Sequence, residues 1–356
     1  MSDRPLSQSI GAILKSESRR LTRAVIGLYL LLGLANVAAW AWALFAFRDY
    51  PALLGTAFLA YGFGLRHAVD ADHIAAIDNV TRKMMQAGHR PIGVGLFFSL
   101  GHSTVVTLGA GLLAFTAGRA WAYFGAIRTV GGLIGTSVSA FVLLALAVFN
   151  LVIFVGVYRT FQRVRAGGRL IEEDFDLLLV SRGFLSALFR PLFRFIERSW
   201  QMFPIGFLFG LGFDTASEVA LLGISAAEGA KGLSLWSIMV FPALFAAGMS
   251  LVDTTDGILM VGAYNWAFLK PIRKLYYNMT ITLISVLVAL IIGGIEVLGL
   301  VARSVQPTGR LWHVVGALNG NFGTLGFVII GLFIASWIVS VAIYRLKGYD
   351  RIEVKT

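Results

Sequence analysis

Long apolar runs, separated by short polar segments, make up most of this chain. A helix that crosses a bilayer needs about 20 mostly apolar residues, and eight runs reach that length. They cover residues 24–47, 52–81, 92–118, 130–157, 202–224, 234–265, 275–302 and 322–344. The pattern predicts an all-α integral membrane protein with eight transmembrane helices.

The composition supports this class. Of the 356 residues, 57% are hydrophobic and 14% are charged, which is typical of a polytopic membrane protein and unusual for a soluble one. The formal net charge is +11, but the basic residues lie between the apolar runs as topology signals do, so no nucleic-acid partner is expected. The chain has no cysteine, which excludes disulfides, thiolate metal ligands and iron–sulfur clusters.

The basic residues alternate between the two sides. With a cytoplasmic N-terminus, the inner segments hold 23 of the 30 Lys and Arg residues, and the outer loops hold six. The positive-inside rule then places both termini in the cytoplasm and the helices in the cell (inner) membrane. Residues 1–23 are expected to be retained, because the following apolar run is too long for a signal peptide and has no evident cleavage site.

This topology divides the chain into five parts. They are a cytoplasmic N-terminal tail (1–23), transmembrane spans one to four (24–157), a cytoplasmic basic loop (158–200), spans five to eight (201–344) and a cytoplasmic C-terminal tail (345–356). Within the loop, the segment FLSALFRPLFRFIERSW is either an amphipathic helix on the inner leaflet or a solvated connector.

Ionisable residues inside the apolar runs are few and concentrated. They are Arg66, His67, Asp70, Asp72, His73 and Asp78 in the second run, His102 in the third, Asp214 and Glu218 in the fifth, and Asp253 and Asp256 in the sixth. A charge inside hydrocarbon costs roughly 2.5 to 3.5 kcal/mol even on a lenient scale, so such residues normally face the bundle interior and mark a functional path. The candidate site therefore belongs to these four runs.

Helical spacing groups the second-run residues. At about 100° per residue, His67, Asp70 and His73 share one face of a continuous helix. Asp72 points to the opposite side unless the helix is locally unwound. Arg66 is expected to be a charge partner for Asp70 or Asp256. In the fifth and sixth runs, the spacings i, i+4 and i, i+3 place each pair of carboxylates on one face.

Two stretches of the chain resemble each other. FGLRHAVDADHIA (63–75) is similar to FGLGFDTASEVA (209–220), and LGHSTVV (100–106) is similar to AGMSLVD (247–253). The two motifs of each unit are separated by nearly equal distances, 38 and 39 residues. Because the second and fifth runs cross in opposite directions under the predicted topology, the two units would be inverted repeats, with the substrate site between them.

The available ligands favour a particular kind of ion. Imidazoles and carboxylates without thiolates suit nickel, cobalt or zinc better than Cu(I), magnesium or calcium. Intrinsic affinities would favour copper and zinc, so selectivity for nickel or cobalt would have to come from geometry. From spacing alone, His67 and His73 are the first candidate ligands, with Asp70 on the same helical face.

At these residues the chain resembles the nickel/cobalt transporter (NiCoT) family. Four segments match the family's motifs in order, namely RHAVDADHI (66–74), LFFSLGHSTVV (96–106), LGFDTASE (211–218) and GMSLVDTTDG (248–257). The resemblance implies an eight-span permease that takes up Ni2+ or Co2+ without an ATPase subunit. It also implies that His67, Asp72 and His73 are the most essential positions. His102, Asp214, Glu218, Asp253 and Asp256 would support transport. Ser217 stands where the family usually has threonine and keeps the hydroxyl.

Two other functions are compatible with some of these features. An intramembrane metalloenzyme would need an HExxH motif or larger histidine boxes, and this chain has five histidines and no HExxH. A proton- or cation-coupled carrier of another metal or small solute would use the carboxylates as proton relays. No phosphate loop ending in GK[ST] is present, so ATP hydrolysis by this chain is not expected. The sequence thus predicts a transporter rather than an enzyme, with the metal as substrate and no cofactor.

Overall fold

The computed structural model describes residues 6–116, 121–165, 196–212, 215–267 and 271–346, which form helices and short connections without a β-strand. The helices are α1 (Leu6–Ala46), α2 (Ala52–His67), α3 (Ala71–Gln86), α4 (Val94–Phe115), α5 (Trp121–Arg165), the short 3-10 helix η1 (Ser199–Gln201), α8 (Met202–Gly210), α9 (Ala216–Ala230), α10 (Leu235–Ile238), α11 (Val240–Ala267), α12 (Pro271–Val305), α13 (Arg310–Asn319) and α14 (Phe322–Leu346). The predicted all-α class is confirmed. The possible amphipathic segment of the basic loop lies mostly outside the described residues.

Six of the described helical segments are long and apolar enough to cross a membrane. They are Leu21–Ala46, Val94–Phe115, Thr129–Arg163, Leu235–Gly262, Met279–Val305 and Phe322–Ser340. These segments coincide with the first, third, fourth, sixth, seventh and eighth predicted spans.

The other two predicted spans are interrupted. The second is divided into α2 and α3, of 16 residues each, and the fifth into α8 and α9, of 9 and 15 residues. A helix of 16 residues rises about 24 Å, which is less than the hydrocarbon thickness of about 30 Å. The second run is not one continuous helix, as its helical spacing had assumed. Asp70 adopts an extended backbone, with φ −65° and ψ 146°, between α2 and α3.

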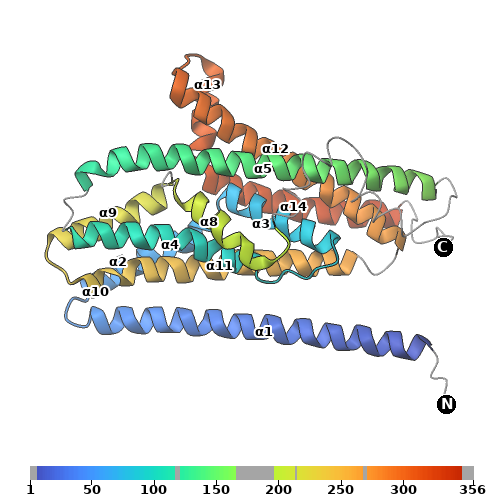
Figure 1. The fold of residues 1–356 in the computed structure, drawn as a ribbon, viewed down its shortest axis with the longest axis horizontal. Coiled ribbons are helices and arrows are strands. Elements are labelled where there is room, and N and C mark those ends of the chain that lie inside the picture. Colours follow the sequence, from blue (N-terminus) through green and yellow to red (C-terminus); the bar gives the residue numbers. More distant parts are fainter. Residues whose placement is uncertain (1–5, 117–120, 166–195, 213–214, 268–270, 347–356) are drawn as a thin grey trace.

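The helices run roughly along the long axis of the molecule (Figure 1). Helices α2, α4, α9 and α11 lie together, α1 covers one flank, and α5 and α12 pack against each other on the other side. The start of α1 and the end of α14 point to the same end of the bundle. The hairpin formed by the end of α12 and α13 projects away from the other helices (Figure 1).

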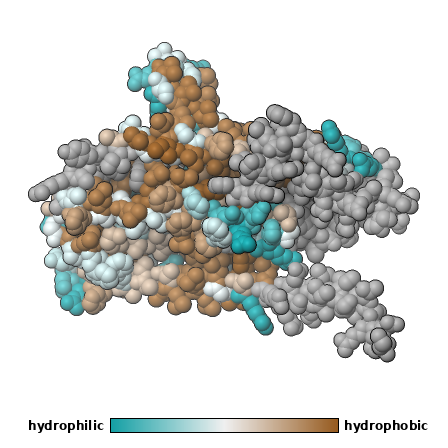
Figure 2. Space-filling model, in the orientation of Figure 1, coloured by the Kyte–Doolittle hydropathy of each residue, from teal (hydrophilic) through white to brown (hydrophobic). Residues whose placement is uncertain are grey.

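The outer surface of the bundle is largely apolar. Hydrophobic residues cover much of the face seen in Figure 2. Side chains such as Leu34, Phe58 and Phe141 are more than 60% exposed. A surface of this kind is stable in contact with lipid acyl chains, whereas in water it would drive association.

Close packing of α4 against α8 depends on glycine. A Cβ on Gly101 would overlap the backbone carbonyl oxygen of Phe203, and a Cβ on Gly206 would overlap that of Phe98. The two contacts are reciprocal, so small residues on both helices let the backbones approach closely, as at many interfaces between membrane helices. This packing fixes the position of α4, which carries His102.

Two basic residues counted with the predicted inner segment 82–91, Arg82 and Lys83, are buried in the fold. Helix α3 continues to Gln86, and Arg82 is fully buried. Its Nη2 donates to Asp78 Oδ2 at 2.6 Å, and its Nη1 donates to the carbonyl oxygen of Ile281 at 3.4 Å. The guanidinium group is thus neutralised within the bundle, where an unpaired charge would be costly.

The α4–α8 contact predicts a contrast between two glycines. Gly101→Ala is expected to lower the thermal stability of the detergent-solubilised protein, because overpacking typically costs about 1–3 kcal/mol. Gly62→Ala in α2 has no atom within 4 Å of the added Cβ and should be neutral or slightly stabilising, because alanine is favoured over glycine in helices by about 0.5–1 kcal/mol. Equal melting temperatures for the two variants would contradict the described packing.

Candidate metal centre

The first break places two histidines side by side. His67 is the last residue of α2, Asp70 precedes α3, and His73 lies in the first turn of α3. Helix α14 approaches this break so closely that a Cβ on Gly326 would overlap the carbonyl oxygen of Val69. The interrupted backbone is therefore enclosed by protein, which is the setting in which non-helical segments are tolerated in membranes.

The second break positions a carboxylate. Thr215 caps α9 in a reciprocal capping box with Glu218, whose backbone N–H donates to Thr215 Oγ1 at 3.4 Å. The Thr215 hydroxyl donates to Glu218 Oε2 at 2.8 Å. The same carboxylate presents Oε1 to His102 Nε2 at 2.8 Å. The local helix start thus aims Glu218 at a histidine of α4.

Three histidine rings meet between these breaks. The ring centroids of His67, His73 and His102 lie 4.6 to 4.8 Å apart, and one ring nitrogen from each lies within 4.8 Å of the others. The three side chains are 2%, 0% and 3% exposed. Nitrogen ligands lie about 2.0–2.1 Å from a zinc-like dication, so a shared ion requires only a modest contraction of this cluster.

His67 is held in place through Nδ1. This nitrogen donates to Asp70 Oδ2 at 3.1 Å and lies 3.3 Å from Thr215 Oγ1 and 3.4 Å from Ser217 Oγ. Its Nε2 is 2.8 Å from His102 Nε2. With the proton fixed on Nδ1, the Nε2 lone pair faces the centre of the cluster.

His73 is oriented in the same manner from α11. Its Nδ1 donates to Asp253, lying 3.3 Å from both carboxylate oxygens. Its buried Nε2 has no hydrogen-bond partner among the described residues, and the same is true of His102 Nδ1. A carboxylate that accepts from the distal ring nitrogen is the usual support of a metal-binding histidine. An imidazole nitrogen without a partner is costly in a buried position unless it serves a ligand.

The structure brings together most, but not all, of the predicted site residues. The histidines form the cluster, and Asp70, Glu218 and Asp253 are hydrogen-bonded to them. Asp72 is half-buried in the first turn of α3, where its charge complements the helix dipole. Asp256 lies one turn beyond Asp253 with a buried Oδ2 that has no hydrogen-bond partner in the described part of the chain. Asp214 lies outside the described residues.

Helical spacing correctly predicted that His67, Asp70 and His73 lie close together, although the helix on which the prediction relied is interrupted. The second-run grouping assumed a continuous helix, whereas His67 and His73 come from two half-helices joined at Asp70. In the fifth run α9 begins at Ala216, and Asp214 lies outside the described residues, so its pairing with Glu218 stays a prediction. The sequence interpretation allowed for local unwinding, and this is the arrangement found in the second run.

Two polar contributors were not singled out as site residues. The hydroxyl groups of Thr215 and Ser217 both lie within 3.4 Å of His67 Nδ1. A signal for Thr215 was present in the sequence, because Thr-x-x-Glu is the spacing of a capping box and marks a helix start. Expecting a helix to begin inside an apolar run would have indicated the second break.

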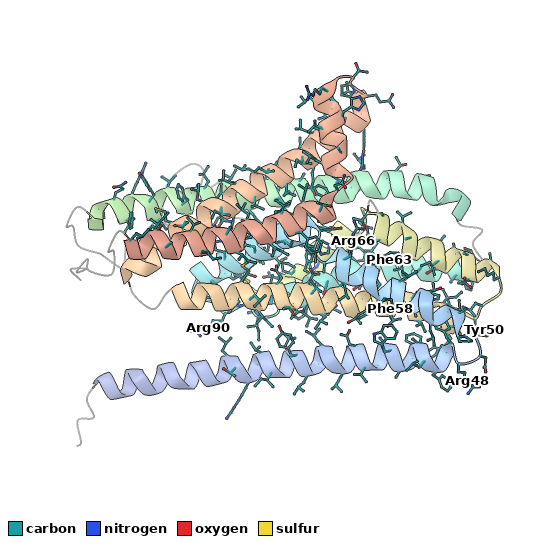
Figure 3. All side chains as sticks on the ribbon, turned by 180° about the vertical axis from the view of Figure 1, so that it is seen from behind. Arg48, Tyr50, Phe58, Phe63, Arg66 and Arg90 are labelled. Atoms are coloured by element: carbon teal, nitrogen blue, oxygen red, sulfur yellow. The ribbon has the colours of Figure 1, made fainter. Side chains whose placement is uncertain are left out.

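Arg66 also differs from its expected role. Among the described residues its guanidinium group makes no ion pair with Asp70, Asp256 or any other carboxylate. It lies beside the start of α14, where a Cβ on Gly323 would be 3.2 Å from Arg66 Nη2 and 3.0 Å from Asp70 Oδ1. Figure 3 shows Arg66 between Tyr50, near one end of the bundle, and Arg90, toward the other.

These features define a class of protein. The fold is a helical bundle with an apolar exterior, and its interior holds imidazoles and carboxylates at the junctions of interrupted helices. Such an arrangement is typical of a polytopic membrane protein that handles an ion.

Comparison with known proteins identifies the family. Residues 53–343 match the family described as high-affinity nickel-transport protein, NicO. The chain is 60% identical to the high-affinity nickel transport protein of Cupriavidus necator over 348 residues, which cover 98% of this chain and 99% of the relative. This chain therefore belongs to the nickel/cobalt transporter family of multi-pass membrane permeases.

More distant relatives cover nearly the same length. The nickel transporter NixA of Staphylococcus aureus is 45% identical, over 90% of this chain and 94% of the relative. The cobalt transport protein NhlF of Rhodococcus rhodochrous is 38% identical, over 95% of this chain and 96% of the relative. No solved structure matches the chain.

The contact between His73 and Asp253 generates a prediction. Asp253→Asn keeps an acceptor oxygen but removes the charge that supports the ring, so Co2+ binding to the purified protein should weaken about 10–100-fold. The Co2+ absorption bands should keep their positions, because the histidine nitrogens expected to bind the ion are unchanged. Asp49→Asn, at an exposed position, serves as the control. Shifted bands in Asp253→Asn would instead make Asp253 a direct ligand.

Proposed function

We propose that this protein is a secondary transporter that takes up divalent transition-metal ions, Ni2+ and/or Co2+, across the cytoplasmic membrane. The observation that carries the proposal is the buried cluster of three imidazoles, two of which are held through Nδ1 by Asp70, just before α3, and by Asp253 of α11. Relatives named for nickel and for cobalt transport support the choice of these two ions.

The ligand set accounts for how such an ion would be held. Nitrogen atoms of His67, His73 and His102 provide neutral donors of intermediate softness. Glu218 lies 2.8 Å from His102 Nε2 and 3.9 Å from His67 Nε2 and is the nearest carboxylate to replace water on the ion. Its negative charge offsets the cost of bringing a dication into a low-dielectric interior. Asp70 and Asp253 then act by orienting the rings.

The remaining predicted residues belong to the path rather than to the cluster in this proposal. Asp256 follows Asp253 by one turn of α11, and Asp72 lies at the start of α3. Both are half-buried carboxylates close in the chain to cluster residues. They would supply transient oxygen contacts as the ion enters or leaves, together with Asp214.

The two interrupted helices support an eight-span topology. In the proposal, α2 with α3 completes the second crossing and α8 with α9 completes the fifth. Both breaks fall inside the matching stretches FGLRHAVDADHIA and FGLGFDTASEVA, which favours the inverted repeat and a site near mid-membrane. Half-helices that meet at a substrate site are common in secondary transporters built from such repeats.

The overall organisation follows from this topology. We propose that both termini and the basic loop 158–200 face the cytoplasm and that the two groups of four spans, 24–157 and 201–344, enclose the site. The protein would act in the cell membrane as a permease, without an ATPase subunit or a resident cofactor, and not as an enzyme. The rival function, coupled transport of another metal or a small solute, would use the same carboxylates without the three-histidine ligation.

The histidine cluster predicts which histidines transport requires. His67→Ala, His73→Ala and His102→Ala are each expected to abolish accumulation of 63Ni and 57Co in cells, because each removes a nitrogen donor from the centre. His89→Ala and His313→Ala, which change exposed histidines, should retain uptake at equal protein levels in the membrane. Normal uptake by the three cluster variants would favour the rival carrier function.

The eight-span topology can be tested with single cysteines, since the natural chain has none. An impermeant maleimide added to intact cells should label Asp49→Cys and Lys231→Cys, whereas His89→Cys and Glu197→Cys should react only after permeabilisation. These positions flank the two interrupted spans. If Asp49→Cys and His89→Cys reacted on the same side, α2 and α3 would not form a crossing.

A further inference from the structure

A small cavity lies next to the histidine cluster, on the side toward α14. Its volume is about 70 Å³, and its lining includes Arg66, Asp70, Thr215, Ser217, Arg303 and Asn319. A space of this size holds one carboxylate group or two to three water molecules. Arg66, labelled in Figure 3, lies near the end of α2 and lines the cavity together with Phe322 and Gly323 at the start of α14.

The cavity and the histidine cluster share a wall. Asp70, Thr215 and Ser217 line the cavity, and each also has an oxygen atom within 3.4 Å of His67 Nδ1. A molecule in the cavity is therefore separated from the His67 ring by a single layer of side chains. The proposed topology places the cavity on the outer side of the cluster.

The charge in this cavity is unexpected for a path that leads to a cation site. Arg66 and Arg303 are both exposed and make no ion pair or hydrogen bond with another described residue, and Asp70 is the one carboxylate among the described residues that line the cavity. That carboxylate already accepts from His67 through Oδ2. Two guanidinium groups against one shared carboxylate repel a bare dication and attract an anion.

Other features of the lining favour an anion. Helices α9 and α14 begin at the cavity, with Ser217 and Gly323 in their first turns. Backbone N–H groups at helix starts add partial positive charge to that of the arginines. Gly323 leaves open the space between Asp70 Oδ1 and Arg66 Nη2, which a Cβ would enter at 3.0 and 3.2 Å. Planar guanidinium groups suit carboxylates, which they bind through paired hydrogen bonds.

We propose that this cavity binds a carboxylate group of a small organic acid, and that the acid reaches the protein as a ligand of the metal ion. The delivery role rests on the proposed transport function, whereas carboxylate binding does not. In the exchange, a carboxylate oxygen leaves the ion and pairs with Arg66 and Arg303. A histidine nitrogen of the cluster takes its place as the ion moves past Asp70 into the centre, so no electron or proton is gained or lost.

Delivery as a metal–carboxylate complex explains how a positively charged cavity can lie beside a site for a metal dication. A dication that carries a dicarboxylate has little or no net positive charge, so the arginines do not repel it. Once the carboxylate is paired with the arginines, the ion is left beside Asp70 and the histidines, where a positive charge is stabilised.

The first test measures carboxylate binding without metal. Malonate, titrated into the detergent-purified full chain against chloride at equal ionic strength, should raise the melting temperature saturably. Arg66→Gln and Arg303→Gln should each weaken the apparent malonate affinity about tenfold or more, because each removes a contact to a charged group. Arg66→Lys should recover part of the affinity, since the positive charge is kept.

The matched control is Arg310→Gln. Arg310 is an exposed arginine on α13, close in the chain to Arg303, and does not line the cavity. This variant should bind malonate as the natural protein does. The proposal is overturned if malonate gives no saturable shift, or if Arg66→Gln and Arg303→Gln keep the full shift, since the effect would then be a general salt effect.

The second test asks whether the acid arrives with the metal. In proteoliposomes at a fixed activity of free Ni2+, added malonate should increase the initial rate of 63Ni uptake by the natural protein and by Arg310→Gln, but not by Arg66→Gln or Arg303→Gln. A rate independent of malonate, with metal-free binding intact, would mean that the site takes a free solution anion and would overturn the delivery role. Absence of 63Ni uptake under all conditions, with malonate binding intact, would instead contradict the proposed transport function.

Discussion

Buried imidazoles are stable in this bundle because carboxylates accept hydrogen bonds from their distal nitrogens. His67 donates to Asp70 and His73 donates to Asp253, and all four side chains are nearly inaccessible. These bonds fix each ring, leave a nitrogen facing the centre and partly compensate the loss of solvation. The rest of the architecture, including the two helix breaks and the glycine contacts, serves to place these groups within reach of each other.

The helix breaks have a second consequence, which concerns how the site is reached. An uninterrupted helix satisfies its own backbone and offers only side chains to a neighbour, whereas a break exposes the first N–H groups of a new helix. At this site, α3, α9 and α14 all begin near His67. Their positive ends, with Arg66 and Arg303, place positive charge on one side of the histidine cluster, while the carboxylates of α3, α9 and α11 place negative charge around the cluster itself.

Much of the site could be predicted from the sequence, because charges inside apolar runs have few permissible positions. Three of the five histidines lie within such runs, and these three form the cluster. Glu218 and Asp253 followed from the same argument. The orientation of each ring could not be predicted, since it depends on contacts between residues such as His73 and Asp253, which are 180 positions apart.

The sequence by itself determined the all-α class, the membrane setting and the runs that carry the polar residues, because apolar length and charge placement are properties of the chain alone. Only the tertiary structure decided where the helices stop. A break at Asp70 or before Ala216 is stable when neighbouring helices cover the freed backbone groups, as α14 does at Val69. The cavity beside Arg66 and Arg303 depends on the same packing, because it joins residues from helices far apart in the chain.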